Sequence, residues 1–136
     1  MAQTNYLYNK TLEYLIGNRN FTNAPVFYVA LSFNTSGSTV SEPSGNGYSR
    51  VAVDNNSTNW STNVDGVVSN ISDISFEEST GAWGAESIKS IAIYDALTNG
   101  NLLYTGPLPL DLQKIVQKAS AVIIPTASIK FGKVTE

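Results

Sequence analysis

The clearest pattern in the chain is a pair of short strands joined by a tight turn between residues 87 and 107. From Ser87 to Asp95, apolar and polar side chains alternate, and β-branched isoleucines favour a pleated strand. Residues 98–101, Thr-Asn-Gly-Asn, contain the Asn-Gly pair that tolerates positive φ in a two-residue turn. The strand resumes at Leu102 and is expected to end at Gly106. This segment therefore predicts a β-hairpin.

Other strand-like segments occur along most of the chain. Pro25 precedes Val26–Phe33, which is apolar on both faces and is predicted to be a central strand covered on both sides. Turn-forming residues fill 34–47 and 54–66, so both are predicted to be exposed loops, the second with Trp60 as its anchor. Further strands are predicted at residues 48–53, 67–70, 71–76, 112–118 and 120–131, the last one interrupted by Pro125.

A helical pattern occurs only near the start, over residues 5–16. Tyr8, Leu12, Leu15 and Ile16 have the i, i+4, i+7, i+8 spacing of one helix face. Thr4 or Asn5 can cap the start, and Gly17 can end the helix in a left-handed conformation. Such a short helix is stable only when it docks on something. It either covers an open end of the β-core or serves as an attachment arm for a neighbouring subunit.

These elements predict an all-β fold, an antiparallel β-sandwich or a jelly-roll-like barrel, with one short N-terminal α-helix. The strands have turn signals between them and no intervening helices, which excludes a parallel α/β sheet. The chain has 136 residues, so we expect a single domain, 1–136, that buries about two-thirds of its unfolded surface.

Charge and residue usage exclude several functions. Only 14% of residues are charged and the net charge is -3, so no nucleic acid or anionic membrane is expected as a partner. Histidine and cysteine are both absent. Histidine-based catalysis and thiolate chemistry are therefore impossible, and we expect no enzyme activity and no cofactor. The Asp and Asn residues of the loops match no known calcium-loop spacing, so no metal site is predicted.

The candidate interaction residues are aromatic or cationic. Trp60, Trp83 and Tyr48 lie in or beside polar loops, where an aromatic ring can stack on a sugar while Asn and Asp side chains bond its hydroxyl groups. The alternative is that each tryptophan turns inward and pins its loop to the core. Arg19 and Arg50, the two arginines of the chain, can hold a partner's carboxylate or form an internal salt bridge.

Several motifs resemble a known family. They are GYSRVAV at 47–53, NNSTNW at 55–60, and the long run from ISFEES at residue 74 through GAWG and IYDALTNGNLLYTGPL to residue 108. The segment 5–31 is similar as well. Together they resemble short bacteriophage virion proteins commonly labelled tail fibre proteins. This chain departs from that pattern at residues 117–120, Gln-Lys-Ala-Ser, where such proteins often have a Gly-Asp turn.

The resemblance implies a non-enzymatic structural protein of a tailed-phage virion, present in multiple copies and bound to other virion proteins. Since the chain has no heptad or shaft repeat, a place at the tip, collar or adaptor of a tail fibre is expected. A capsid decoration protein and a carbohydrate-binding module that recognises a host glycan are the alternatives. The first ten residues show no signal-peptide pattern, so we expect synthesis in the host cytoplasm and a final location in the virion.

Overall fold

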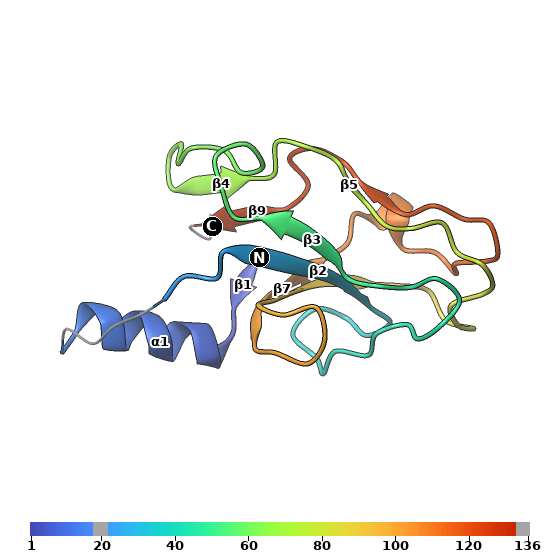
Figure 1. Cartoon of the computed structure of the whole chain (residues 1–136), viewed down its shortest axis with the longest axis horizontal. Helices are drawn as coiled ribbons and strands as arrows, with labels where there is room; N and C mark the ends of the chain where they lie inside the picture. Colours follow the sequence, from blue (N-terminus) through green and yellow to red (C-terminus); the bar gives the residue numbers. More distant parts are fainter. Residues whose placement is uncertain (18–21, 133–136) are drawn as a thin grey trace.

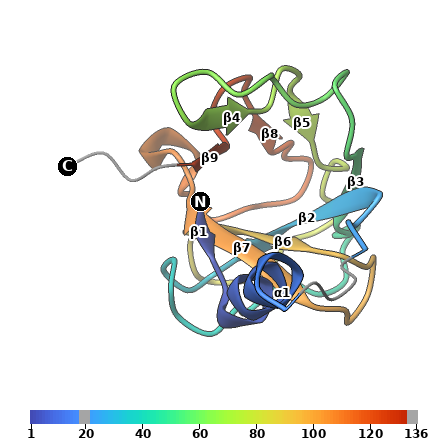
Figure 2. The same ribbon diagram turned by 90° about the vertical axis from the view of Figure 1, so that its left-hand side faces the viewer.

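The computed structural model describes residues 1–17 and 22–132. Its main sheet has five strands in the order β1-β7-β6-β2-β3, and two smaller sheets pair β4 with β9 and β5 with β8. Figures 1 and 2 show the small sheets on one side of the main sheet and the helix on the other. The strands are β1 (Ala2–Gln3), β2 (Val26–Ser32), β3 (Val51–Asp54), β4 (Val67–Ser69), β5 (Ile74–Ser75), β6 (Ser90–Tyr94), β7 (Leu102–Pro107), β8 (Ile123–Ile124) and β9 (Lys130–Gly132). The expected all-β fold with one helix is confirmed.

The predicted hairpin and the predicted central strand form the middle of the main sheet. β6 and β7 pair antiparallel, and the turn between them places Asn99 at φ 54° and Gly100 at φ 76°. β2 lies between β6 and β3, with Leu31 opposite Ile91 and Val29 opposite Ile93. The second half of β2 is buried, as expected for a strand that is covered on both faces.

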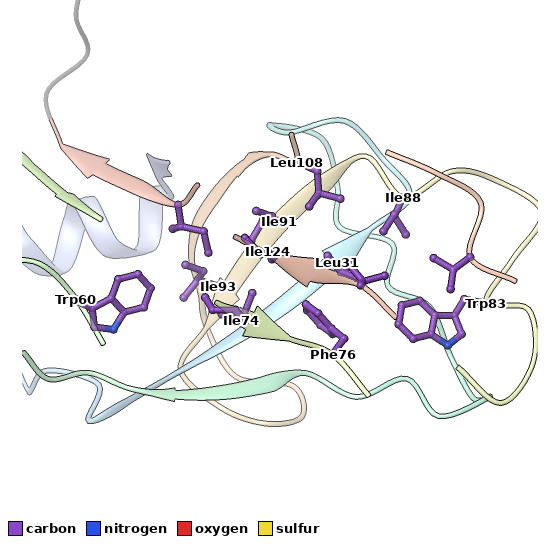
Figure 3. Packing of buried hydrophobic residues seen from close by; sticks show 14 residues of the cluster. Leu31, Trp60, Ile74, Phe76, Trp83, Ile88, Ile91, Ile93, Leu108 and Ile124 are labelled. Atoms are coloured by element: carbon purple, nitrogen blue, oxygen red, sulfur yellow. The ribbon is translucent and has the colours of Figure 1, made fainter. Parts of the chain in front are cut away.

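The core fills the space between the main sheet and the smaller sheets. Val29, Leu31, Ile91 and Ile93 project from the main sheet into it. Ile88 and Leu108 lie in the chain next to β6 and β7 of the main sheet. The opposite layer and its loops supply the rest of the buried cluster, which Figure 3 shows at close range: Trp60, Ile74, Phe76, Trp83, Val116, Val122, Ile124 and Ile129. This cluster joins segments far apart in sequence, so it holds the two layers together without any disulfide.

The second layer contains less regular strand than the sequence predicts. Residues 112–118 were expected to be a strand, but a 3-10 turn, η1 (Leu110–Leu112), leads instead into irregular chain. Val116 is nevertheless buried, and its carbonyl accepts a hydrogen bond from the backbone N–H of Trp83 at 3.0 Å. The apolar pattern of this segment therefore reflects the burial of single side chains rather than the hydrogen-bonded pairing of a strand. Pro125 divides the last run into β8 and β9, as predicted.

The turn at 117–120 keeps a left-handed residue although it has no glycine. Ala119 adopts φ 60°, a conformation that glycine tolerates better than alanine. Buried Ser79 fastens the turn: its carbonyl accepts from the Ala119 N–H at 2.7 Å, and its hydroxyl oxygen accepts from the Ser120 N–H at 3.0 Å. The Ser79 hydroxyl in turn donates to the carbonyl of Gln117. These local bonds hold the backbone shape that a glycine would adopt with less strain.

Helix α1 (Asn5–Leu15) begins at the predicted cap, because the Thr4 hydroxyl oxygen accepts a hydrogen bond from the Leu7 N–H at 3.3 Å. Thr4 also ties the helix to β7: its N–H donates to the Leu103 carbonyl at 3.0 Å and its hydroxyl to the Leu102 carbonyl at 2.6 Å. Leu7 is the buried residue of α1. The helix turns Leu7 to the sheet, whereas Tyr8 and Leu12 of the predicted apolar face are exposed, so this face does not cover the β-core.

The two tryptophans allow a matched test of core energetics. The Trp83 indole N–H donates to the Asn46 carbonyl at 3.0 Å, whereas the buried Trp60 indole N–H has no hydrogen-bond partner within residues 1–17 and 22–132. Phenylalanine loses ring volume at either site but removes a hydrogen bond only at 83. We expect Trp83→Phe to lower the free energy of unfolding by at least about 1 kcal/mol more than Trp60→Phe, as measured by urea denaturation. An equal or reversed order would contradict this packing.

Candidate interaction surface

The three aromatic residues singled out from the sequence lie in or against the core. Trp60 is 6% exposed and Trp83 is 5% exposed. Trp60 packs edge-on against Phe27 at 5.8 Å between ring centroids, and Trp83 packs edge-on against Tyr48 at 5.2 Å. Burial leaves neither indole with an open face for a sugar ring. Sugar or partner contacts by these residues stay a prediction, and the structure places both tryptophans as loop anchors.

Tyr48 has its ring and its hydroxyl group engaged. The ring stacks on Phe76 with 6.2 Å between centroids. The hydroxyl donates to Glu42 Oε1 at 2.7 Å and accepts from the Leu31 N–H at 3.1 Å. Burial raises the pKa of Tyr48 far above its ordinary value, and the negative charge of Glu42 adds to the rise. Tyr48 therefore stays protonated and links the loop at Glu42 to the central strand β2.

Arg50 is the centre of a polar network that closes the loops at one end of the main sheet. Its guanidinium meets Glu42 in a two-pronged pair, with Nε to Oε1 at 3.1 Å and Nη2 to Oε2 at 2.8 Å. Nη1 donates to the carbonyls of Ala96 and Asn99, each at 2.8 Å. The guanidinium also lies 3.7 Å from the ring centroid of Tyr94. Arg50 thus forms the internal salt bridge that the sequence allowed.

The remaining sites predicted from the sequence are Arg19 and the two polar loops. Arg19 lies outside the described residues. The loop 34–47 is tied to the sheet, since the Ser32 hydroxyl oxygen accepts from the N–H groups of Asn34 and Ser41 at 3.1 and 2.9 Å. In the loop 54–66, the Asn56 side-chain oxygen accepts from the Thr58 and Asn59 N–H groups at 3.0 and 3.2 Å. Internal bonds of this kind shape both loops.

Among the described residues, exposed large apolar side chains are most closely spaced along α1 and at its C-terminal end. The outer stripe, as we call Tyr8, Leu12, Leu15 and Ile16, has side chains that are respectively 54%, 41%, 65% and 74% exposed. At about 100° per residue, Tyr8, Leu12 and Leu15 lie about 80–140° around the helix from Leu7, which faces the sheet. Ile16 follows the last helical residue in an extended conformation. Figure 1 shows α1 projecting beyond the end of the sheet. Sequence periodicity predicts this stripe but leaves open whether it covers the β-core or contacts a neighbouring subunit, because a helix pattern does not say which apolar side is covered.

The charged residues of α1 lie away from the outer stripe. Lys10 and Glu13 face each other at 3.6 Å in an exposed pair, and the Lys10 ammonium lies 5.9 Å from the ring centroid of Tyr6. Helix α1 therefore has an exposed apolar side that is available for contact. Its polar side faces solvent, and there the charges of Lys10 and Glu13 offset each other. Within the described ranges, no helix is long and apolar enough to cross a membrane, and no group of three or more acidic residues is placed to hold a metal ion.

Comparison with protein families identifies the chain. The model of the family described as Podophage GP4 fiber I protein gp80 matches residues 2–132. The chain belongs to this family. A search of the curated proteins finds no match.

The family match covers the helix and all the strands of the described structure. The matched range runs from β1 to β9 and includes α1, so the whole β-module with its projecting helix is the family's unit. The chain is a structural protein of the phage tail-fibre type, with its place in the virion and its partners among other virion proteins. For such a protein, the features that matter are surfaces for association rather than a reactive centre.

The Arg50 network makes a sharp prediction for stability. The side chain of Arg50 is 8% exposed and that of Glu42 is 22% exposed, so their pairing is shielded from water. A lysine ammonium cannot form both bonds to Glu42 and also reach two carbonyls. We expect Arg50→Lys to lower the free energy of unfolding by about 2 kcal/mol or more in chemical denaturation.

The matched control is Lys10→Ala, which breaks the exposed pair on α1. Exposed ion pairs contribute little, so this variant should change stability by less than about 0.5 kcal/mol. Equal losses in the two variants would show that the Arg50 network is not the stabilising element described above.

Proposed function

We propose that the chain is a non-enzymatic tip or adaptor module of a podophage tail fibre, present in multiple copies that associate through α1. The exposed outer stripe carries this proposal. A tail-fibre protein associates with other virion proteins, and the described residues offer their longest run of open apolar side chains on α1. The partner that best fits the stripe is the same stripe of a second copy.

The spacing of the stripe suits another helix. Tyr8, Leu12 and Leu15 are separated by four and then three residues, which is the interval at which side chains of two packed helices interlock. An identical helix carries the same interval, so two copies match each other along the contact. Leu and Tyr side chains at such positions lose exposed apolar area on contact, which favours association.

Charge does not oppose this contact. Lys10 and Glu13 lie on the other side of α1 and neutralise each other, so two copies can approach stripe to stripe without placing like charges together. Asn5 and Asn9 flank the stripe and can form hydrogen bonds across a helix pair. This arrangement supports a contact between copies more than binding to a strongly charged partner.

The start of α1 is fixed to the sheet, so a contact made by the helix also orients the β-module. Two hydrogen bonds from Thr4 to β7 fix where the helix starts and in which direction it leaves the sheet. The stripe alone covers about two helical turns, well short of the roughly 800 Å² per partner of a standard interface. Association of free subunits should therefore be weak and concentration-dependent, and it gains strength where several copies are held side by side in a fibre.

Analytical ultracentrifugation of the full chain tests this contact. We expect the wild-type protein to pass from monomer to oligomer as its concentration rises into the hundreds of micromolar, and Leu12→Glu to weaken association at least about 10-fold. The matched control is Leu110→Glu, which places the same charge at a leucine that is 85% exposed on η1. A wild-type protein that stays monomeric at every concentration, or equal effects of both variants, would overturn association through α1.

Electron microscopy of intact particles then separates the fibre from the head. Density for the β-module on the tail fibre is the expected result. Density on the outer capsid surface would instead establish the decoration role, whatever the outcome of the association experiment.

A further inference from the structure

The inner side of α1 borders a pocket that the outer stripe does not use. It lies between α1, residues 22–25, and the ends of β3, β6 and β7. Its volume is about 400 Å³, within the range of roughly 300–1,000 Å³ that is typical of small-molecule sites. The lining residues that matter for its chemistry are Tyr6, Thr11, Asn23, Asn55, Asp95 and Tyr104.

Three polar residues of this pocket keep free hydrogen-bond acceptors. Asp95 takes one hydrogen bond on each oxygen from Asn101, at 2.7 Å from the backbone N–H and 2.9 Å from the side chain, so each oxygen keeps a lone pair. The Asn55 amide nitrogen donates one hydrogen to the Ala24 carbonyl at 3.0 Å, which leaves its side-chain oxygen as an acceptor and its second N–H as a donor. The Thr11 hydroxyl donates to the Leu7 carbonyl at 2.9 Å and keeps its oxygen lone pairs.

The hydrogen bonds of these three residues also hold the pocket in shape. The bond from Asn55 to Ala24 joins the chain after β3 to the segment that leads into β2. Asp95 and Asn101 close the hairpin between β6 and β7. Thr11 is fixed on the inner side of α1 by its bond to Leu7. The three acceptors are therefore positioned before any ligand arrives, which lowers the entropy cost of binding.

The aromatic and charged residues of the pocket restrict the chemical class of the ligand further. Tyr6, which is 38% exposed, contributes ring surface at the helix side, and Tyr104 and Phe27 line the sheet side. None of the described residues that line the pocket is a lysine or an arginine, and Asp95 supplies a carboxylate. An anionic ligand would be repelled by that carboxylate, which no cation among the described lining residues offsets. A fully apolar ligand would leave the remaining acceptor positions of Asp95 and Asn55 unpaired.

We propose that this pocket binds a neutral saccharide. A sugar has many hydroxyl donors and no charge, which suits the three positioned acceptors, and it has apolar ring faces that pack on tyrosine. Adjacent hydroxyl groups of one sugar ring can donate to the two oxygens of Asp95. The pocket and the outer stripe lie on different sides of α1, so sugar binding does not depend on whether copies associate.

Saturation-transfer NMR on the full-length protein tests this site. The probes are neutral oligosaccharides of glucose, galactose, mannose and N-acetylglucosamine, with a sialylated oligosaccharide and inorganic phosphate as the anionic comparison. We expect saturable binding of at least one neutral oligosaccharide and no binding of either anionic probe. Tyr6→Ala and Asn55→Ala should each weaken that binding about 10-fold or more.

Tyr8→Ala is the matched control, because it removes an exposed tyrosine of the same helix from the other side. It should leave sugar affinity unchanged, and thermal unfolding should show that all three variants remain folded. The proposal is overturned if no neutral oligosaccharide binds, if the anionic probes bind instead, or if Tyr8→Ala weakens binding as much as Tyr6→Ala does. Each of these results would leave association through α1 intact.

Discussion

The antiparallel pairing of β2 with β6 is the contact on which the rest of the structure depends. These two strands supply residues to both faces of the main sheet. Val29, Leu31, Ile91 and Ile93 face the core, while Ala30 and Ala92 are buried on the other face. A chain without disulfides has to obtain its stability from such packing and pairing. With this pair in register, β7 and β3 can add on either side and the smaller sheets can close the core.

The outer strands then determine what the molecule presents to its surroundings. β1 pairs with β7 and covers an edge that would otherwise be open to other strands. The same edge receives the two Thr4 hydrogen bonds that start α1. Because only Leu7 among the helix residues is buried, α1 is fastened at one end and carries its apolar stripe outward. A short helix with this geometry leaves its apolar stripe exposed, which is the surface that the proposed association uses.

Local sequence signals predicted the central part of the fold well and its second layer less well. The Asn99-Gly100 turn, the doubly covered strand β2, the Thr4 cap and the break at Pro125 each have a local physical cause that can be recognised in the sequence. The segment at 113–118 does not, because Val116 is buried through long-range contacts and the chain around it forms no ladder. Only the tertiary structure decides whether an apolar residue lies in a strand or in irregular chain.

The candidate interaction residues show the same limit of prediction from local sequence. Arg50 and Tyr48 have sequence patterns that suit partner binding, yet their hydrogen bonds are all formed within the chain at Glu42, Leu31, Ala96 and Asn99. The pocket on the inner side of α1 could not be predicted, since it combines residues from 3 to 104 that no spacing rule connects. The outer stripe was visible as a pattern, but its exposure follows from the direction in which Thr4 starts the helix.

Hydrogen–deuterium exchange at two protein concentrations tests the central claim most directly. At low concentration, the amides of β2 and β6 should be the most protected in the chain, and those of α1 should exchange far faster because the helix has one buried residue. Raising the concentration should slow exchange in α1 and leave β2 and β6 unchanged. Protection of α1 equal to that of β2 at low concentration, or early exchange of β2 and β6, would contradict the account.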